Sequence, residues 1–545
     1  MKKIISLCLI TLFPFFLLSG CKKGEDSPAG KLIRYYLEGE PQNLDPQLSN
    51  DPSSLLVVRN IFEGLVRLNE NGEPQPGVAS RWESNSDHTS FTFYLREDAR
   101  WSDGSPVTAD DFVFGIRRSV LPETGCPSFE ETVACIKNAR AIHDGSANPD
   151  SLGVYAADAH TLVIELETPF SDFPSQTAKA PFMPCQEKFF SLCMGQYGLE
   201  PKYILSNGPF SIREKNGWRH GQYVRLELNE NYAGENSPLP SGVLLTVSEP
   251  PEDVVGALMS EDASLDASPL PADQLEEAME NGLSVTSFTD TTWGICVNTK
   301  TPVFENKKVR QAFFSSINRE IALSAIPSGG TATDGILPPQ LTLLGEPYRE
   351  LAGNLNLPYL EPAQTRQLLA DGLAELGSGS LSTLTLLCLD DMASKTLANN
   401  LVACWKDGLG HYLRIDPVSE SELKSRVSSG NYQLAIYPLQ AFTENPVDFL
   451  EQFSSESALN LWGYSSGEFD SLLQQASNNH DTALDFVQQA EQLLLDDGIF
   501  YPLYEENSYY AMGPTVSNIL FLPFQNGADF FFAGKTEKRL PSSST

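Results

Sequence analysis

Residues 74–118 read PQPGVASRWESNSDHTSFTFYLREDARWSDGSPVTADDFVFGIRR. Alternate positions from Phe91 to Leu95 are apolar, which predicts a half-buried strand. Trp101-Ser-Asp-Gly104 predicts a turn, because glycine tolerates the positive φ that many turns need. Thr108 is the expected N-cap of a following helix whose first turn carries two aspartates, as suits the helix dipole. This stretch therefore predicts a strand, a turn and an amphipathic helix.

The sequence of this stretch also resembles that of a known family. Residues 78–114 resemble the signature of the family 5 extracellular solute-binding proteins, which are the oligopeptide-, dipeptide- and nickel-binding receptors of ABC importers. Within that family the chain is most similar to oligopeptide-binding lipoproteins. EPQNLDP at 40–46, NIFEGLVRL at 60–68 and the run from Thr291 to Ala325 are similar to further family landmarks. The resemblance covers nearly the whole mature chain, with gaps near 236–285 and 340–360.

The resemblance implies an α/β protein with the two-lobed periplasmic-binding-protein fold (type II, cluster C). A small extra subdomain would sit in the first lobe, and a hinged cleft would lie between the lobes. The expected segments follow the chain: signal peptide 1–20; lipidated tether 21–30; lobe I 31–80, 201–290 and 505–545; inserted subdomain 81–200; lobe II 291–504.

Periodicity supports this outline independently. Apolar residues at helical spacing predict a helix over 53–68. Between 361 and 438, predicted helices alternate with short apolar strands, and this rhythm indicates a mixed α/β sheet. The expected helices there are 361–373, 393–409 and 421–427, and the expected strands are 384–389, 413–415 and 433–438.

Length and composition set the broad class. The chain has 545 residues, which is too long for one core and predicts two or three domains. Its content of 41% hydrophobic and 10% aromatic residues is typical of globular proteins. The net charge of −34 argues against nucleic acid as a partner, and against an anionic membrane surface, since both select basic patches.

The N-terminus predicts export and lipidation. Lys2 and Lys3 precede a run of about 15 apolar residues, which suits a signal peptide better than a membrane span. Leu18-Ser-Gly-Cys21 resembles a bacterial lipobox, in which Cys21 becomes the lipidated first residue. Residues 22–30 are polar and suit a tether. We therefore expect the protein outside the cytoplasm, in the periplasm or at the cell surface, held to the membrane through lipid on Cys21.

Seven cysteines remain after Cys8 leaves with the signal and Cys21 is acylated. Oxidising conditions outside the cell permit disulfides, but an odd number leaves at least one thiol unpaired within the chain. Cys126 with Cys135, and Cys185 with Cys193, are the local candidates for pairing.

Signals for catalysis or a cofactor are missing from the sequence. It contains no G-x-S-x-G elbow, no HExxH helix, no Walker A motif, and no G-x-G-x-x-G after a strand. The six histidines are scattered singly, and the CxxC spacing of zinc sites does not occur. We expect no enzyme activity, no cofactor and no resident metal.

The resemblance places candidate ligand-binding residues in the cleft. Two lobes joined by crossing strands close on a ligand, and an extended peptide pairs its backbone with strands lining the cleft. Each candidate aromatic is equally well explained as a core residue. The candidates are Ser49, Asn50, Asp51, Thr292, Trp293, Tyr437, Leu439, Gln440, Phe442, Glu444, Asn460 and Tyr504.

One position departs from the family pattern. In typical peptide receptors an aspartate in the motif D-x-x-x-P pairs with the α-amino group of the ligand, and here Phe442 holds that position. A charge-assisted hydrogen bond contributes roughly 1.5–3 kcal/mol, so its loss is substantial. Either Glu444 substitutes from two positions along, or the ligand lacks a conventional N-terminus, as in a cell-wall-derived peptide.

The sequence therefore predicts a monomeric, lipid-anchored receptor that delivers oligopeptides, or peptide-like solutes, to an ABC permease in the cytoplasmic membrane. The first alternative keeps the fold and changes the cargo to a murein peptide, a dipeptide, a nickel chelate or haem. A secreted hydrolase with unrecognised acidic catalysis and a surface adhesin are the alternatives from other classes.

Overall fold

The computed structural model describes residues 32–536 apart from 38, 70–71, 130–131, 171, 235–236, 249–250, 261–263, 344, 379, 442, 456, 458, 479–481 and 525–526. Two large buried apolar clusters organise these residues. One draws on residues between Ile33 and Ala267 and between Ile519 and Ala533, and we call the elements around it lobe I. The other draws on residues between Trp293 and Tyr504, and we call its elements lobe II.

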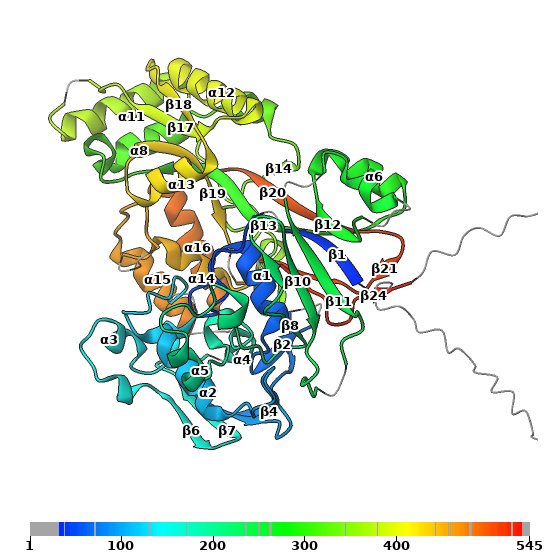
Figure 1. Cartoon of the computed structure of the whole chain (residues 1–545). Coiled ribbons are helices and arrows are strands. Elements are labelled where there is room, and N and C mark those ends of the chain that lie inside the picture. Colours follow the sequence, from blue (N-terminus) through cyan, green and yellow to red (C-terminus); the bar gives the residue numbers. More distant parts are fainter. Residues whose placement is uncertain are drawn as a thin grey trace, which may run out of the picture.

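The main sheet runs through both lobes (Figure 1). Its strands follow the spatial order β18-β17-β19-β13-β20-β12-β1-β11-β10-β8, with β14 added on β20 and β9 on β10. Their bounds are β1 Leu32–Leu37, β8 Phe210–Ile212, β9 Trp218–Arg219, β10 Tyr223–Leu228, β11 Gly242–Val247, β12 Ala267–Leu270, β13 Ser284–Val297, β14 Gly330–Ala332, β17 Thr385–Leu389, β18 Arg414–Val418, β19 Leu434–Gln440 and β20 Phe500–Met512.

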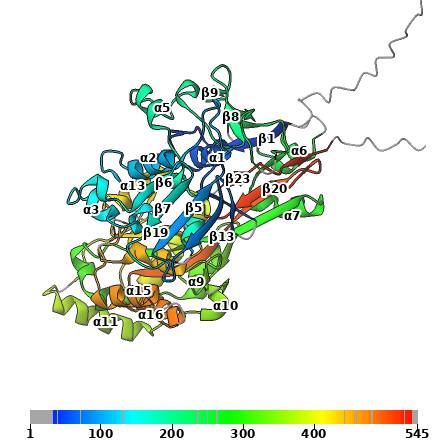
Figure 2. The ribbon, with the colours of Figure 1, turned by 90° about the horizontal axis from the view of Figure 1, so that it is seen from below.

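Strands β13 and β20 carry the chain between the lobes. They pair antiparallel over most of their length and run side by side through the molecule (Figure 2). Their register shifts between Phe288 and Thr291, and such irregularities bend a ladder locally. Asp290 lies at this shift, buried, and its Oδ2 accepts a hydrogen bond of 2.9 Å from the Phe524 backbone in the C-terminal part of lobe I. At this point the β13–β20 ladder bends, and Asp290 joins it to the C-terminal part of lobe I.

Helix α1 (Pro52–Ile61) opens lobe I. Asp51 is its N-cap and accepts from the Ser54 backbone at 2.8 Å, and proline at the first position suits a helix start. The predicted helix over 53–68 is wrong beyond Ile61. Glu63 turns inward to meet Arg96, and Gly64 packs so tightly that a Cβ there would lie 2.8 Å from the Thr177 carbonyl oxygen. Residues 66–68 form strand β2 instead.

Residues 79–192 form a four-stranded unit, which appears at the bottom of Figure 1. Its antiparallel sheet has the order β4-β5-β7-β6, and α2 (Ala109–Val120) contacts β6 and β7. The strand, turn and helix predicted here are confirmed. The Asp111 carboxylate, buried in the first turn, accepts from Trp101 Nε1 at 3.2 Å and from the Thr108 backbone at 2.8 Å. The strands are β4 Ala79–Ser84, β5 Ser90–Leu95, β6 Val154–Asp158 and β7 Thr161–Glu165.

A buried ion pair joins this unit to the start of the chain. Arg118 on α2 donates to both carboxylate oxygens of Asp45, at 2.5 and 3.1 Å, and to Gln47 at 2.6 Å. Both charged side chains are almost fully buried. The aspartate of the LDP sequence is thus a structural partner of α2.

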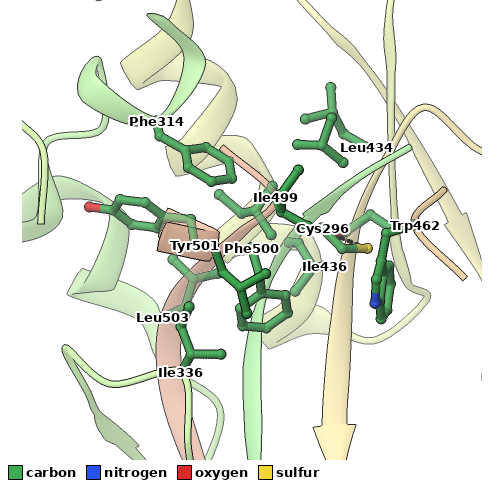
Figure 3. Close-up of a cluster of buried hydrophobic side chains, with 14 of the residues drawn as sticks. Cys296, Phe314, Ile336, Leu434, Ile436, Trp462, Ile499, Phe500, Tyr501 and Leu503 are labelled. Atoms are coloured by element: carbon green, nitrogen blue, oxygen red, sulfur yellow. Dashed lines mark hydrogen bonds between the residues drawn. The ribbon is translucent and has the colours of Figure 1, made fainter. Parts of the chain in front are cut away.

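Lobe II follows the predicted α/β rhythm. Strand β17 pairs parallel with β18 and β19, whereas β19 pairs antiparallel with β13, so the sheet is mixed as expected. Its core is built from the crossing strands, and Figure 3 shows Phe314 and Tyr501 facing one another there, with ring centroids 5.3 Å apart. The helices of this lobe are α8 Lys307–Ser315, α9 Arg319–Ala322, α10 Tyr348–Ala352, α11 Pro362–Glu375, α12 Met392–Leu409, α13 Glu420–Ser428, α14 Pro446–Leu450, α15 Gly467–Asn478 and α16 Ala483–Asp496.

Short elements complete the fold. The small two-stranded pairs are β2 Val66–Leu68 with β3 Pro74–Pro76, β15 Thr342–Leu343 with β16 Glu346–Pro347, β21 Val516–Ser517 with β24 Gly534–Lys535, and β22 Leu520–Leu522 with β23 Gly527–Asp529. The remaining helices are α3 Ala139–His143, α4 Phe173–Gln176, α5 Glu187–Leu192, α6 Val254–Met259 and α7 Leu275–Glu280.

The candidate disulfides do not form. All seven cysteines of the described chain are free. Cys135 Sγ donates to the Thr132 carbonyl at 3.2 Å and Cys193 Sγ to the Phe189 carbonyl at 3.2 Å, while the Arg118 guanidinium lies 3.5 Å from Cys185 Sγ. These three thiols thus each have another polar group as a neighbour. Among the described helices, none combines the length and apolar character needed to cross a bilayer.

Candidate ligand-binding site

A cavity of ≈ 280 Å³ lies where α1, the four-stranded unit and the C-terminal part of lobe I meet. Ligand pockets commonly measure roughly 300–1,000 Å³, so this one is small. Its lining is mainly apolar, with a few polar groups and two cationic side chains. The lining residues are Ser49, Asn50, Leu55, Val58, Arg59, Pro127, Ser128, Thr132, Ala178, Lys179, Ala180, Pro181, Met183 and Phe524.

The loop before α1 forms one edge of the cavity. The Ser49 hydroxyl lies 2.6 and 2.8 Å from the carbonyls of Asn43 and Asp45, which fixes the loop, and Asn50 is exposed beside it. Asp51 is occupied by capping α1 and is not among the lining residues. Two of the three residues predicted for this wall therefore reach the cavity.

Arg59 brings a guanidinium to the same wall from the last turn of α1. Burial lowers the pKa of Arg59 to about 10, although the charge of Asp529 acts to raise it. Asp529 itself is bonded to Arg67 at 2.5 Å. Arg59 therefore shares a carboxylate that another arginine already holds.

Lys179 lies in the cavity wall and faces a group of carboxylates. Its charge acts on Asp172 in the four-stranded unit and on Glu444 and Asp448 in lobe II. Burial is the main cause that raises the pKa of each of these three carboxyl groups. The cavity thus adjoins a junction between the lobes that is rich in desolvated acidic groups.

Glu444 lies at this junction. Its Oε2 accepts from the Thr342 hydroxyl at 3.4 Å, and a Cβ placed on Gly72 of lobe I would lie 3.9 Å from the same oxygen. Asp448, one turn further along, accepts from Thr443 at 2.8 Å. Glu444 is therefore between the lobes, with its carboxylate engaged in one long hydrogen bond.

Six of the predicted residues lie on the crossing strands and on β19. Thr292 pairs with Leu439 and Trp293 with Tyr504 across the ladders, where Thr291 also pairs with Gln440. The Trp293 and Tyr504 rings stack at 5.9 Å, and Trp293 Nε1 donates to Glu506 at 2.5 Å. The Tyr437 ring packs edge-on against Trp462. None of the six is among the lining residues of the cavity.

Three more predictions remain to be placed. Asn460 pins its own loop, with its amide donating to the carbonyls of Ser454 at 2.9 Å and Tyr464 at 2.6 Å. Phe442 and Cys21 lie outside the described residues. Among the described candidates, the structure therefore gathers Ser49 and Asn50 at the cavity and Glu444 at the adjoining junction, and it places the others elsewhere.

Sequence reasoning missed Arg59, Lys179 and Phe524. Arg59 lies in a helix that the sequence marks only by its apolar stripe, which predicts packing and not binding. Lys179 belongs to no recognised motif. Phe524 has a left-handed φ of 62°, which a bulky residue rarely adopts. No local signal in the sequence marks that strain.

The described residues hold no group of three or more His, Cys, Asp or Glu side chains able to bind a metal ion. His220, for example, pairs with Glu40 at 2.6 Å near the edge of lobe I. The arrangement that remains is a small cavity in lobe I beside a junction between the two cores, where charged groups of both signs lie. Together with two crossing strands, it is the arrangement expected of a two-lobed binding protein.

Comparison with known proteins identifies the family. The family model described as bacterial extracellular solute-binding proteins, family 5 Middle, matches residues 73–460. The chain belongs to this family, as the resemblance implied, and family 5 proteins serve transporters as binding proteins. It is 26% identical to the dipeptide-binding protein DppE of Bacillus subtilis, over 93% of this chain and 95% of that protein.

Solved structures confirm the predicted fold. The substrate-binding domain of an oligopeptide ABC transporter from Bacillus anthracis aligns with a TM-score of 0.78 and 25% identity, covering 93% of this chain and 99% of that one. The murein tripeptide-binding protein MppA of Escherichia coli aligns at 0.75 and 26% identity, covering 93% and 98%. Its unliganded open form aligns at only 0.66, with 97% of that chain covered. The lobes here are therefore arranged more like the former MppA structure than like the open one.

Proposed function

We propose that this protein is a lipid-anchored extracytoplasmic receptor that captures peptides between its lobes and delivers them to an ABC permease. The observation that carries the proposal is the cavity in lobe I that adjoins the lobe junction, with guanidinium and ammonium groups in its wall and carboxylates beside it. A peptide offers both groups that such a site would bind, an amine and a carboxylate. The family and its peptide-binding relatives support the same conclusion.

In this proposal the segments have distinct roles. Residues 31–80, 201–290 and 505–545 form the anchored lobe, with 81–200 inserted in it, and residues 291–504 form the lobe that closes. Lipid on Cys21 holds the monomer at the membrane surface. The protein binds without turnover and needs no cofactor.

Glu444 takes the role of the amine-reading aspartate that Phe442 replaces. Its carboxylate is half-buried and lies between the lobes, so a ligand ammonium there would replace lost hydration. The backbone groups of the crossing strand β13 and of β19 already pair with each other within the sheet. Thr292 and Trp293 lie on β13, and Leu439 and Gln440 lie on β19. Side-chain charge therefore contributes more to recognition here than free strand edges do.

The test is calorimetric titration of the soluble protein, residues 22–545, with tripeptides that have a free or an acetylated N-terminus. We expect acetylation to weaken binding by about tenfold to a hundredfold, the range for a charge-assisted hydrogen bond. Glu444→Gln should erase that difference, whereas Glu468→Gln, an exposed glutamate on α15, should preserve it. Equal affinity of the wild type for both peptides would remove Glu444 from this role, and failure to bind any peptide would refute the peptide receptor.

A second test addresses catalysis and anchoring. Peptide recovered after binding should have an unchanged mass, and a cleaved peptide would favour the hydrolase alternative. Cys21→Ser should move the protein from the membrane fraction to the soluble extracytoplasmic fraction. Retention of the variant on the membrane would contradict lipidation at this cysteine.

The size of the cavity favours a short cargo. At ≈ 280 Å³ it lies at the low end of ligand pockets, so a dipeptide or a murein-type tripeptide fits the enclosed space better than a long chain. The relatives DppE and MppA are a dipeptide-binding and a murein peptide-binding protein. Competition between tripeptides and pentapeptides in the same titration decides between a short and a long cargo.

A further inference from the structure

Phe524 belongs to lobe I by its place in the chain, but it also packs against lobe II. It lies between β22 and β23 and is one of the residues that line the cavity in lobe I. Its half-buried side chain packs against the apolar cluster of lobe II. Val58 and Met183, which line the cavity too, belong to the cluster of lobe I. Phe524 is therefore in contact with both the cavity and the opposite lobe.

The backbone of Phe524 is held in a strained conformation. Its φ of 62° lies in the left-handed region, which a bulky residue rarely adopts. Its N–H donates to Asp290 Oδ2 at 2.9 Å, and Asp290 is only 4% exposed. The other oxygen of this carboxylate accepts from the Thr291 hydroxyl at 3.0 Å. Because strained conformations persist only where the surroundings fix them, the bond to Asp290 and the contact with lobe II together hold Phe524 in place.

Asp290 lies where the crossing strand bends. The register of β13 against β20 shifts between Phe288 and Thr291, on either side of Asp290. The backbone carbonyl of Asp290 accepts from the backbone N–H of Ala441 at 2.8 Å, just beyond β19 in lobe II. One residue thus connects the bend, lobe II and the backbone of Phe524. A movement of lobe II about this bend therefore changes the surroundings of Phe524.

We propose that Phe524 is a positioning residue that couples an apolar side chain of the ligand in the lobe I cavity to the closing of lobe II, and that Asp290 holds it in place for this role. This inference rests on the proposed function and adds a property of its ligand. The ligand group beside Phe524 is apolar because Leu55, Val58 and Pro181 also line that space.

The physical basis is a difference in contacts between the open and closed arrangements. A ligand shifts a conformational equilibrium only as far as its affinities for the two states differ. A solute that touches only residues of lobe I would bind both arrangements equally. Phe524 rests on lobe II while it lines the cavity, so a side chain packed against it gains contact when the lobes are closed. Filling the cavity therefore favours closure.

The first experiment uses the wild-type soluble protein, residues 22–545, with Ala-Leu-Ala and Ala-Gly-Ala. Calorimetric titration should show that Ala-Leu-Ala binds about tenfold or more tightly, since burying a leucine side chain is worth roughly 1.5–3 kcal/mol. Small-angle X-ray scattering should show a smaller radius of gyration with Ala-Leu-Ala bound. Equal affinity within twofold, or binding without compaction, overturns the inference and leaves a peptide receptor intact. No binding of these or any other peptide refutes the proposed function instead.

The second experiment changes the ring. Phe524→Ala should reduce the preference for Ala-Leu-Ala to within threefold and abolish the compaction, while the affinity for Ala-Gly-Ala stays within threefold of the wild type. Phe524→Tyr keeps the ring and should restore both properties. Phe532→Ala is the matched control, because Phe532 is a half-exposed phenylalanine in the same part of lobe I. A Phe524→Ala protein that behaves as the wild type, or that loses both ligands equally, contradicts the inference.

The third experiment changes the support of Phe524 at a distance from the ligand. Asp290 is not among the lining residues of the cavity. Asp290→Ala removes the acceptor of the Phe524 N–H, and it should weaken Ala-Leu-Ala binding by threefold or more and reduce the compaction. Asp290→Asn keeps an acceptor oxygen and should stay within twofold of the wild type. An Asp290→Ala protein identical to the wild type in both measurements overturns the link to the bend, and the Phe524 series decides if this variant does not fold.

Discussion

Buried carboxylates inside lobe II differ sharply from those at the junction between the lobes. Glu491 on α16 is 1% exposed and accepts from the backbones of Ile336 and Leu337, from the Tyr348 hydroxyl and from the Arg349 guanidinium at 2.5 Å. Among the described residues, Glu444 accepts one long side-chain bond from Thr342, and it lies near the charges of both Asp172 and Lys179. A full set of partners marks a charge that holds the fold together, whereas a desolvated charge with a sparse set is available to a ligand.

The largest effect is expected inside the lobe. Arg349→Met removes the ion-pair partner of Glu491 and leaves a buried carboxylate without its counter-charge. The free energy of unfolding should fall by about 3–5 kcal/mol, because an uncompensated buried charge is costly. Urea unfolding monitored by circular dichroism measures this loss. A loss below about 1 kcal/mol would contradict the conclusion that the carboxylate inside lobe II stabilises the fold more than those at the junction do.

The crossing strands should show an intermediate effect. Trp293→Phe keeps a ring against Tyr504 but removes the hydrogen bond to Glu506. Burial raises the pKa of Glu506 and the Trp293 bond lowers it, so the variant leaves a desolvated carboxylate with less support. We expect a loss of about 1–3 kcal/mol in urea unfolding. Peptide affinity should stay within threefold, and a larger loss would mean that the indole contacts the ligand.

The acidic groups at the junction should make the free energy of unfolding depend on pH. Burial raises the pKa of Asp448 above its ordinary value of 3.8, so the folded state binds protons more tightly there than the unfolded state. Between that ordinary value and the raised one, its contribution to the free energy of unfolding falls as pH rises, by at most about 1.4 kcal/mol per pH unit. Asp448→Asn should remove this contribution. The free energy of unfolding of the variant minus that of the wild type should therefore increase from pH 4 upward. A constant difference across that range would show that Asp448 is not linked to protons in this way.

An exposed pair gives the lower bound of the comparison. Lys424 and Glu420 face each other one turn apart on α13 at 2.7 Å, and both side chains are more than half exposed. Lys424→Ala should change the free energy of unfolding by less than about 0.5 kcal/mol. The same urea experiment checks it, and a larger change would show that exposure is a poor guide to charge energetics in this chain.

The sequence predicted those parts whose causes are local. The strand and capped helix around Phe91 and Thr108 depend on neighbouring residues, as does the alternation of lobe II, and both are confirmed. The overlong helix over 53–68 failed because its apolar spacing continues past Ile61 while its end is decided elsewhere. Glu63 turns toward Arg96, 33 residues along the chain, and no periodicity contains that contact.

The candidate site was harder for the same reason. Asp51 and Asn460 are polar residues in loops, and their side chains are used for a helix cap and a loop, which short-range sequence reasoning can recognise only in retrospect. Arg59, Lys179 and Phe524 come together from positions far apart in the chain, so only the folded structure reveals their proximity. The family resemblance supplied Ser49, Asn50 and Glu444, because it carries three-dimensional information from relatives.

The two ends of the described chain lie together. Lys535 on β24 donates to the carbonyl of Leu32 on β1 at 3.0 Å, and its ammonium also pairs with Asp266 at 2.7 Å. The chain is therefore suited to circular permutation, because its described ends are close enough to be joined. A short linker from 536 to 32 would join them, and new ends could open in the exposed turn at Gly430 of lobe II. Such a permuted protein would carry its fusion partners on the lobe opposite the natural termini.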